Sequence, residues 1–185
     1  APECGQTPEY YFAAEGLATG VVFAPGAGEA APYSSHVGSL VMVLDDGFQS
    51  DLGWTVTSAA GMVSGMWQRA IPGGWDDGSP PADYDGSGRC YVTDNRSTYD
   101  VDGGPTQLLS PVLDLSATTG PVLRYAEWFT CDDPLPPAQD FLDVFLSSDD
   151  GATWVQVAHL PSHGGWVPHE VRIADYIPLT STVRV

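Results

Sequence analysis

The sequence contains no lysine and only six arginines, against 24 aspartates and glutamates, so its formal net charge is −18. Nucleic acids and anionic membrane surfaces would repel such a chain, so neither is expected as a partner. Long apolar runs are also missing, and no stretch approaches the roughly 18 residues of a membrane span. The acidity suits an extracellular or cell-surface protein that meets divalent cations, which prefer carboxylate ligands. Acidity that serves only solubility is the alternative.

Cysteine is scarce as well. Three cysteines are too few for a disulfide-scaffolded mini-domain, and none lies in the CxxC spacing of a zinc site. In an oxidising compartment Cys90 and Cys131 are predicted to link two strands of the larger domain by a disulfide. Cys4 would then be left over, which indicates an intermolecular bond or a partner outside this chain. A buried free thiol is the alternative.

No window shows a sustained 3.6-residue apolar period, while Gly and Pro together supply 37 of the 185 residues. Because glycine and proline interrupt regular structure so often, we expect short strands and turns, and therefore an all-β fold. The candidate strands in the first part of the chain are residues 9–14, 20–24 and 39–44. Those in the second part are residues 54–58, 66–70, 90–93, 106–109, 122–129, 141–147, 153–160, 166–173 and 182–185.

Residues 1–43 hold too few strands to cover both faces of a sandwich. Their pattern is a cysteine, GQTPEYYFAAEG, a proline-rich loop to PYSS and an apolar strand. It resembles the last strands of an immunoglobulin-like or fibronectin type III-like domain. This part is therefore expected to be a partial immunoglobulin-like segment whose missing strands come from elsewhere.

Residues 44–185 carry eight or nine candidate strands with long polar connections, which predicts a jelly-roll β-sandwich. The segments DDGFQSDLGWTVT, GMWQRAIP, RCYVTDN, DVDGGPTQLLSPVLDLS, PVLRYAEWF, DVFLSSDDGATWVQV and GWVPHEVRIADYI follow in that order. Together they resemble the bacterial MAM-like jelly-roll module. Such modules are appended to secreted zinc carboxypeptidases and surface proteins, often after immunoglobulin-like repeats, and have no chemistry of their own.

A calcium site is the main candidate site. An acidic loop beside a strand end, as in DVDGG, is a natural place for a hard cation. The resemblance implies a cation between the opening strand, this loop and a carboxylate late in the chain. The matching residues are Asp46 with the Gln49 region, Asp100, Asp102 and Asp143. A solvated acidic turn without an ion is the alternative.

Other motifs point to binding or modification. Trp75 lies in a Gly-Pro-Asp loop, where an exposed ring would stack on a sugar, although a loop tryptophan is more often a local plug. Asn95 opens the glycosylation sequon Asn-Arg-Ser. The run SSDDGATW, residues 147–154, resembles the Asp-box turn of sialidases, where it is structural; Trp154 is expected to pack on the sheet.

Catalytic motifs are missing. The histidines at 159, 163 and 169 match no common zinc spacing, and no GxSxG elbow is present. Acidic pairs such as Asp76 and Asp77 lie in loops, where rigid positioning is hard. The sequence therefore predicts a protein that is not an enzyme.

Two functions remain. The first is a non-catalytic extracellular β-sandwich subunit that acts through protein–protein contact. It would form a fibre or surface assembly, stabilised by calcium, in which other copies of the chain or neighbouring β domains donate strands. The second is an accessory module of a secreted hydrolase, such as a zinc carboxypeptidase, that binds a glycan or the substrate.

Overall fold

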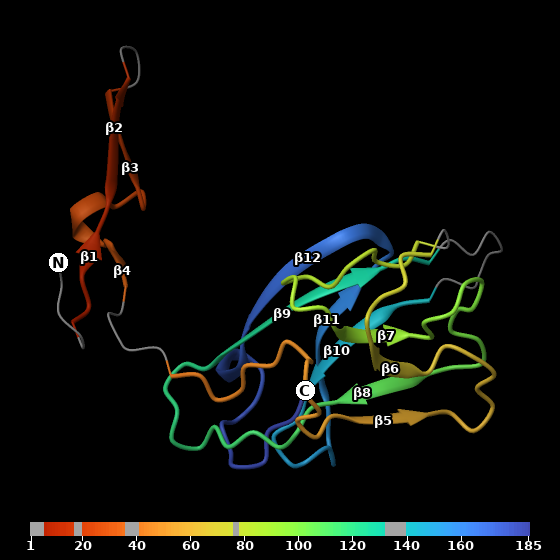
Figure 1. Ribbon diagram of the computed structural model, residues 1–185. Helices are drawn as coiled ribbons and strands as arrows, with labels where there is room; N and C mark the ends of the chain where they lie inside the picture. The colour runs from red at the N-terminus through yellow and green to blue at the C-terminus, as the bar shows by residue number, and fades with distance from the viewer. Residues whose placement is uncertain (1–5, 17–19, 36–40, 76–77, 132–139) are drawn as a thin grey trace. The chain divides into compact units, whose positions relative to one another are not determined.

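The computed structural model describes residues 6–16, 20–35, 41–75, 78–131 and 140–185 (Figure 1). The chain divides into two compact units, Ala1–Met42 and Val43–Val185. Regular structure in the described residues consists of β-strands and two single-turn 3-10 helices, which confirms the all-β class. The same residues include no helix that is long and apolar enough to cross a membrane.

In the part of the first unit that the structure describes, the strands form two small antiparallel pairs. Strand β2 pairs with β3 along its whole length, and the two-residue strands β1 and β4 pair with each other. The bounds of its elements are β1 Glu9–Tyr10, β2 Phe12–Gly16, β3 Gly20–Ala24, η1 Gly28–Ala30 and β4 Tyr33–Ser34.

The strand predicted for residues 39–44 is wrong for the part that the structure describes. Residues 41–44 have no strand conformation, and residues 39–40 lie outside the described residues. Val41, Met42 and Val43 are 79%, 61% and 46% exposed. An apolar run predicts a strand only where a neighbour pairs with it and covers it, and residues 41–44 have no pairing partner among the described residues.

The described residues of the second unit form eight strands, and each lies within three residues of its predicted bounds. Their bounds are β5 Thr55–Ser58, β6 Trp67–Ala70, β7 Cys90–Thr93, β8 Thr106–Leu109, β9 Val122–Phe129, β10 Leu142–Leu146, β11 Val155–Leu160 and β12 His163–Arg172. The short helix η2, Ile173–Asp175, follows β12.

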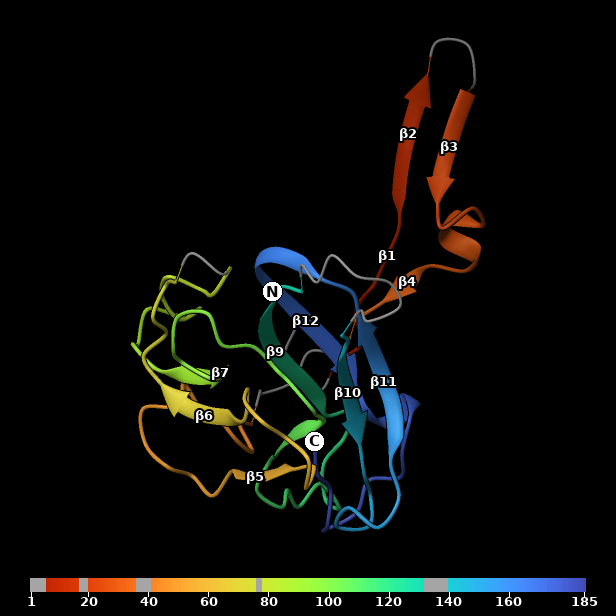
Figure 2. The same cartoon turned by 90° about the vertical axis from the view of Figure 1, so that its right-hand side faces the viewer.

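These strands form antiparallel pairs. Strand β5 pairs with β8, β6 with β7, β9 with β12, and β10 with β11. The pairing of β5 with β8 joins strands far apart in the sequence, whereas β10 and β11 are consecutive and form a hairpin. Figures 1 and 2 show β9 beside β12 and β10 beside β11. Strands β6 and β8 also lie next to each other.

The hydrophobic core of the second unit lies at the β9–β12 and β10–β11 pairs. Its buried residues are Leu115 in the segment before β9, Leu146 of β10, Ile173 of η2, and Ile177 and Val183 in the segment after η2. Leu123 of β9, Val157 of β11 and Val171 of β12 pack against this cluster. The alternation of inward and outward residues in β10 follows the two-residue period of a strand.

A glycine fixes the place where two loops cross. Ser64 pairs with Asp102 in an isolated bridge, and the next residue, Gly65, has a φ of +85°. A Cβ atom on Gly65 would lie 2.3 Å from the Cα of Val101. Only glycine permits so close an approach, so this residue holds the acidic loop against the start of β6.

Candidate functional site

The residues predicted to bind calcium have different hydrogen-bond partners. Asp46 accepts hydrogen bonds from the Phe48 N–H at 2.7 Å and from the Trp54 Nε1 at 2.9 Å, one on each carboxylate oxygen. Asp143 Oδ1 accepts a bond from Gln156 Nε2 at 2.8 Å and lies 2.6 Å from His159 Nδ1.

Asp100 and Asp102 meet a different residue, Ser64. The Ser64 hydroxyl donates to the Asp100 carbonyl at 2.9 Å, and Asp102 pairs with Ser64 through the backbone. Across the described ranges, no three carboxylate, imidazole or thiol groups are arranged to hold a metal ion. Calcium binding at the four predicted aspartates therefore stays a prediction.

The Gln49 region contacts residues 83–89 of an acidic loop, a contact that the sequence did not predict. Gln49 Nε2 donates to the Gly47 carbonyl at 2.8 Å and to the Ser87 hydroxyl at 2.9 Å. Asp83, which is 9% exposed, accepts bonds from the Ser87 hydroxyl at 3.0 Å and from the Gly88 N–H at 2.6 Å. Hydrogen bonds from Ser87 lower the pKa of Asp85. A turn at this place can be predicted from the sequence, because residues 83–88 are DYDGSG, a run of turn-forming acidic residues and glycines.

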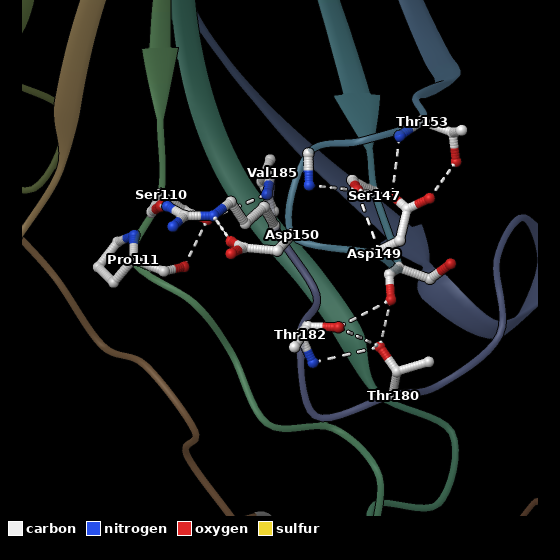
Figure 3. Close-up of polar contacts among 12 residues, drawn as sticks. Ser110, Pro111, Ser147, Asp149, Asp150, Thr153, Thr180, Thr182 and Val185 are labelled. Carbon is white, nitrogen blue, oxygen red and sulfur yellow. Dashed lines mark hydrogen bonds and ion pairs between the residues drawn. The ribbon is translucent and has the colours of Figure 1, made fainter.

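The Asp-box turn joins β10 to β11 around a buried serine and an exposed aspartate (Figure 3). The Ser147 hydroxyl accepts a bond from the Gly151 N–H at 2.8 Å and donates to Asp149 Oδ1 at 2.8 Å. Asp149 also accepts bonds from the Thr153 N–H at 2.8 Å and its hydroxyl at 2.7 Å. Trp154 lies over Gly151 and is 39% exposed, so its ring is not buried in the core.

The segment after η2 holds this turn in place. Instead of the predicted strand at 182–185, Val183 and Arg184 form isolated bridges with Leu113 and Ser147. Thr180 and Thr182 donate hydroxyl bonds to the Ser148 carbonyl at 2.6 and 3.0 Å. The role of the Asp box is therefore structural: it fixes the hairpin on the core.

The same segment also contacts Ser110 through Arg184 and Val185, and Figure 3 labels Ser110, Asp150 and Val185. The Arg184 guanidinium pairs with the Asp150 carboxylate and donates to the Ser110 carbonyl at 2.7 Å. The Val185 N–H donates to the hydroxyl of Ser110, a residue that is 1% exposed.

A buried glutamate between two histidines is the second group that sequence reasoning missed. Glu127 of β9 is 7% exposed, and its Oε1 lies 2.6 Å from His163 Nε2 and 3.0 Å from His169 Nε2. The His169 ring stacks on Tyr125 with the ring centroids 4.9 Å apart. Burial, with a smaller effect of the Glu127 charge, raises the pKa of Tyr125. We call Glu127, His163 and His169 the His–Glu–His cluster.

The predicted disulfide is not formed. Cys90 is buried and Cys131 is half-buried, and both are free thiols. Cys90 lies on β7, which pairs with β6, whereas Cys131 follows β9 and its N–H donates to the Ser162 hydroxyl. Burial, with the nearby charge of Asp83, raises the pKa of Cys90 to about 11. Cys4, Asp76 and Asp77 lie outside the described residues.

The binding and modification candidates are both at the surface. Trp75 is 40% exposed and lies over the backbone of Gly73, where a Cβ atom would be 2.3 Å from the indole Nε1. Asn95 is half-buried, and its Nδ2 donates to the Ile71 carbonyl at 2.7 Å. The nitrogen that would carry a glycan is therefore already engaged.

The first unit exposes its large apolar side chains. Each of these side chains is at least 40% exposed: Tyr10, Tyr11, Phe12, Val21, Val22, Phe23 and Tyr33. Tyr10 contacts Phe12 and Tyr33 by its ring, and Tyr11 contacts Phe23. We call these seven residues the aromatic surface.

Comparison of the chain with models of protein families, with curated proteins and with solved structures gives no match.

Proposed function

We propose that the chain is a non-catalytic extracellular β subunit that acts through protein–protein contact, and that other copies of the chain complete its first unit with their strands. The observation that carries the proposal is the aromatic surface. Strands β2 and β3 expose every described side chain, and a two-stranded hairpin alone is marginally stable in water. Covering one such apolar side chain contributes on the order of 1.5–3 kcal/mol.

Both faces of the β2–β3 pair carry apolar groups. The register places Phe12 opposite Ala24 and Ala14 opposite Val22, while Ala13 lies opposite Phe23. Successive residues of a strand point to opposite faces, so Phe12 and Val22 share one face and Phe23 lies on the other. A ribbon that is apolar on both faces suits the interior of a larger sandwich, and its free edges accept added strands.

We propose that residues 44–185 form a jelly-roll sandwich of the MAM-like type. The order of the seven segments supports this, as do the pairings of β5 with β8 and of β9 with β12, which join strands far apart in the sequence. Calcium belongs to the same proposal, because the acidic loops that contain Asp46 and Asp100 offer the oxygen ligands that it prefers.

The test is the size of the intact chain by sedimentation and negative-stain microscopy, in calcium and again with a chelator. We expect assemblies larger than the 19.6 kDa chain, which the Phe12→Ser variant reduces to monomers. Phe141→Ser is the matched control, since Phe141 is 55% exposed but lies in the second unit. Its assemblies should match those of the wild type, and their loss in chelator would identify calcium as the stabilising ion.

A compact wild-type monomer in both conditions would overturn the proposal. The accessory-module function would then be preferred, with the exposed Trp75 ring as the first group to test against glycans.

A further inference from the structure

We propose that residues 41–44, with the sequence Val-Met-Val-Leu, are the strand that one copy of the chain donates to another, and that they pair with the free edge of β3. This inference rests on the proposed function and names the segment that joins the copies. We call residues 41–44 the donor segment.

The donor segment is an apolar run that is left uncovered. Val41, Met42 and Val43 are 79%, 61% and 46% exposed, and residues 41–44 pair with no strand among the described residues. Consecutive apolar residues are typical of a strand that is covered on both faces, whereas a strand with one face in water alternates apolar and polar residues. Segments that only connect two units are usually rich in glycine, serine, proline or charge. The composition of the donor segment therefore indicates burial against a partner.

The β2–β3 pair offers an acceptor of the matching kind. Phe12 and Val22 lie on one of its faces and Phe23 lies on the other, so both faces are apolar. Alternate residues of a strand point to opposite faces, so the donor segment would add two apolar side chains to each face. An added strand of this kind continues both surfaces of the pair.

Of the two edges of this pair, that of β3 suits an added strand better. Among the described residues, β2 and β3 pair only with each other, which leaves one edge of each unpaired (Figure 2). Strand β2 carries Glu15, and a charged side chain on an edge strand opposes the addition of a further strand. Strand β3 has the sequence GVVFA, without charge or proline. The donor segment is uncharged too, so their contact adds no repulsion between acidic side chains.

The proposed contact also sets the form of the assembly. Each copy carries one donor segment and one β3 edge, and these are different surfaces. A contact between two different surfaces runs head to tail, so it continues from copy to copy as a filament or closes into a ring.

The test mixes two variants of the full chain, each defective in one half of the contact. Met42→Asp places a charge in the donor segment and leaves the β2–β3 pair unchanged, whereas Phe12→Ser alters that pair and leaves the donor segment unchanged. We expect each variant alone to self-associate at least about tenfold more weakly than the wild type in sedimentation. The equimolar mixture should form dimers, because it contains one intact donor segment and one intact acceptor.

Met66→Asp is the matched control for the added charge. Met66 is 50% exposed and lies in the second unit, so this variant should assemble as the wild type does. Recovery of dimers in the mixture also excludes misfolding as the cause of the defect in either variant.

A second measurement locates the contact in the wild-type sequence. Copies that contain photoreactive methionine are mixed with isotope-labelled copies, and mass spectrometry identifies the cross-links that join the two. We expect cross-links from residue 42 to residues 20–24 of the labelled copy.

The outcomes separate this inference from the proposed function. Wild-type assembly that Met42→Asp leaves unchanged would overturn the inference while the proposed function stands. An equimolar mixture that stays monomeric, or cross-links from residue 42 to the second unit alone, would overturn it in the same way. A wild-type chain that is monomeric in every condition would overturn the proposed function and this inference together.

Discussion

Removal of the Ser147 hydroxyl should destabilise the second unit, because this buried group holds the Asp-box turn together. Ser147 is 1% exposed, and its hydroxyl accepts a bond from the Gly151 N–H at 2.8 Å and from the Asp149 N–H at 3.3 Å. In Ser147→Ala these two backbone donors lose their acceptor, while the bridge between residue 147 and Arg184 is kept because it uses the backbone.

The size of the effect follows from the two lost acceptor contacts. A buried donor left without a partner costs about 1–3 kcal/mol, and an ordinary bond contributes about 0.5–1.5 kcal/mol. We therefore expect Ser147→Ala to lower the free energy of unfolding by about 2–3 kcal/mol. For a unit of this size that corresponds to a Tm lower by about 5–10 °C. The bond from the Ser147 hydroxyl to the exposed carboxylate of Asp149 is largely replaced by a bond to water, so it is left out of this figure.

Urea unfolding followed by tryptophan fluorescence measures the change. All six tryptophans lie between residues 54 and 166, so the signal reports the second unit alone. Ser148→Ala is the matched control: Ser148 binds Thr180 and Thr182 through its carbonyl, which the substitution preserves. Equal losses of stability in the two variants, or a loss below about 0.5 kcal/mol in Ser147→Ala, would refute the role assigned to the hydroxyl.

Two further predictions concern thiol chemistry and pH. Cys90 is buried with a pKa raised to about 11, so iodoacetamide at pH 8 should label the folded chain at Cys131 well before Cys90; mass spectrometry that finds equal rates would contradict this burial. Hydrogen bonds from Thr153 and then Ser147 lower the pKa of Asp149 from 3.8, so its stabilising contribution is present above that value and is lost as the pH falls through the lower folded pKa. Asp149→Asn should therefore reduce the fall of the urea midpoint between about pH 5 and about pH 2, and an unchanged pH profile would count against it.

The strands of the second unit could be predicted because their signals are local. Alternating side chains in β10 and turn residues such as Asp150 and Gly151 mark strand and turn within a few positions. Residues 41–44 carry an equally apolar local signal, yet they form no strand, because pairing depends on a partner that the local sequence does not specify.

The candidate sites depend more strongly on register than the strands do. The hydrogen-bond partner of His163 and His169 could not be predicted from local spacing, because Glu127 lies on another strand, 36 and 42 residues away. Only the pairing of β9 with β12 brings the three together. The Asp box was recognisable, in contrast, because Ser147, Asp149 and Thr153 interact within one turn.

The acidity of the chain sets a condition on the proposed assembly. The first unit has no arginine or lysine, and its described charges are Glu9, Glu15 and Glu29, so two copies that meet there repel each other. At about 4 Å in water one pair of like charges costs about 1 kcal/mol, against about 1.5–3 kcal/mol gained for each apolar side chain that is covered. Four covered side chains of the aromatic surface therefore outweigh three repulsive pairs once the longer-range charge is screened. Because the Debye length falls from about 30 Å at 0.01 M salt to about 10 Å at 0.1 M, contact between copies should strengthen as salt is added, whereas a basic partner would bind more weakly.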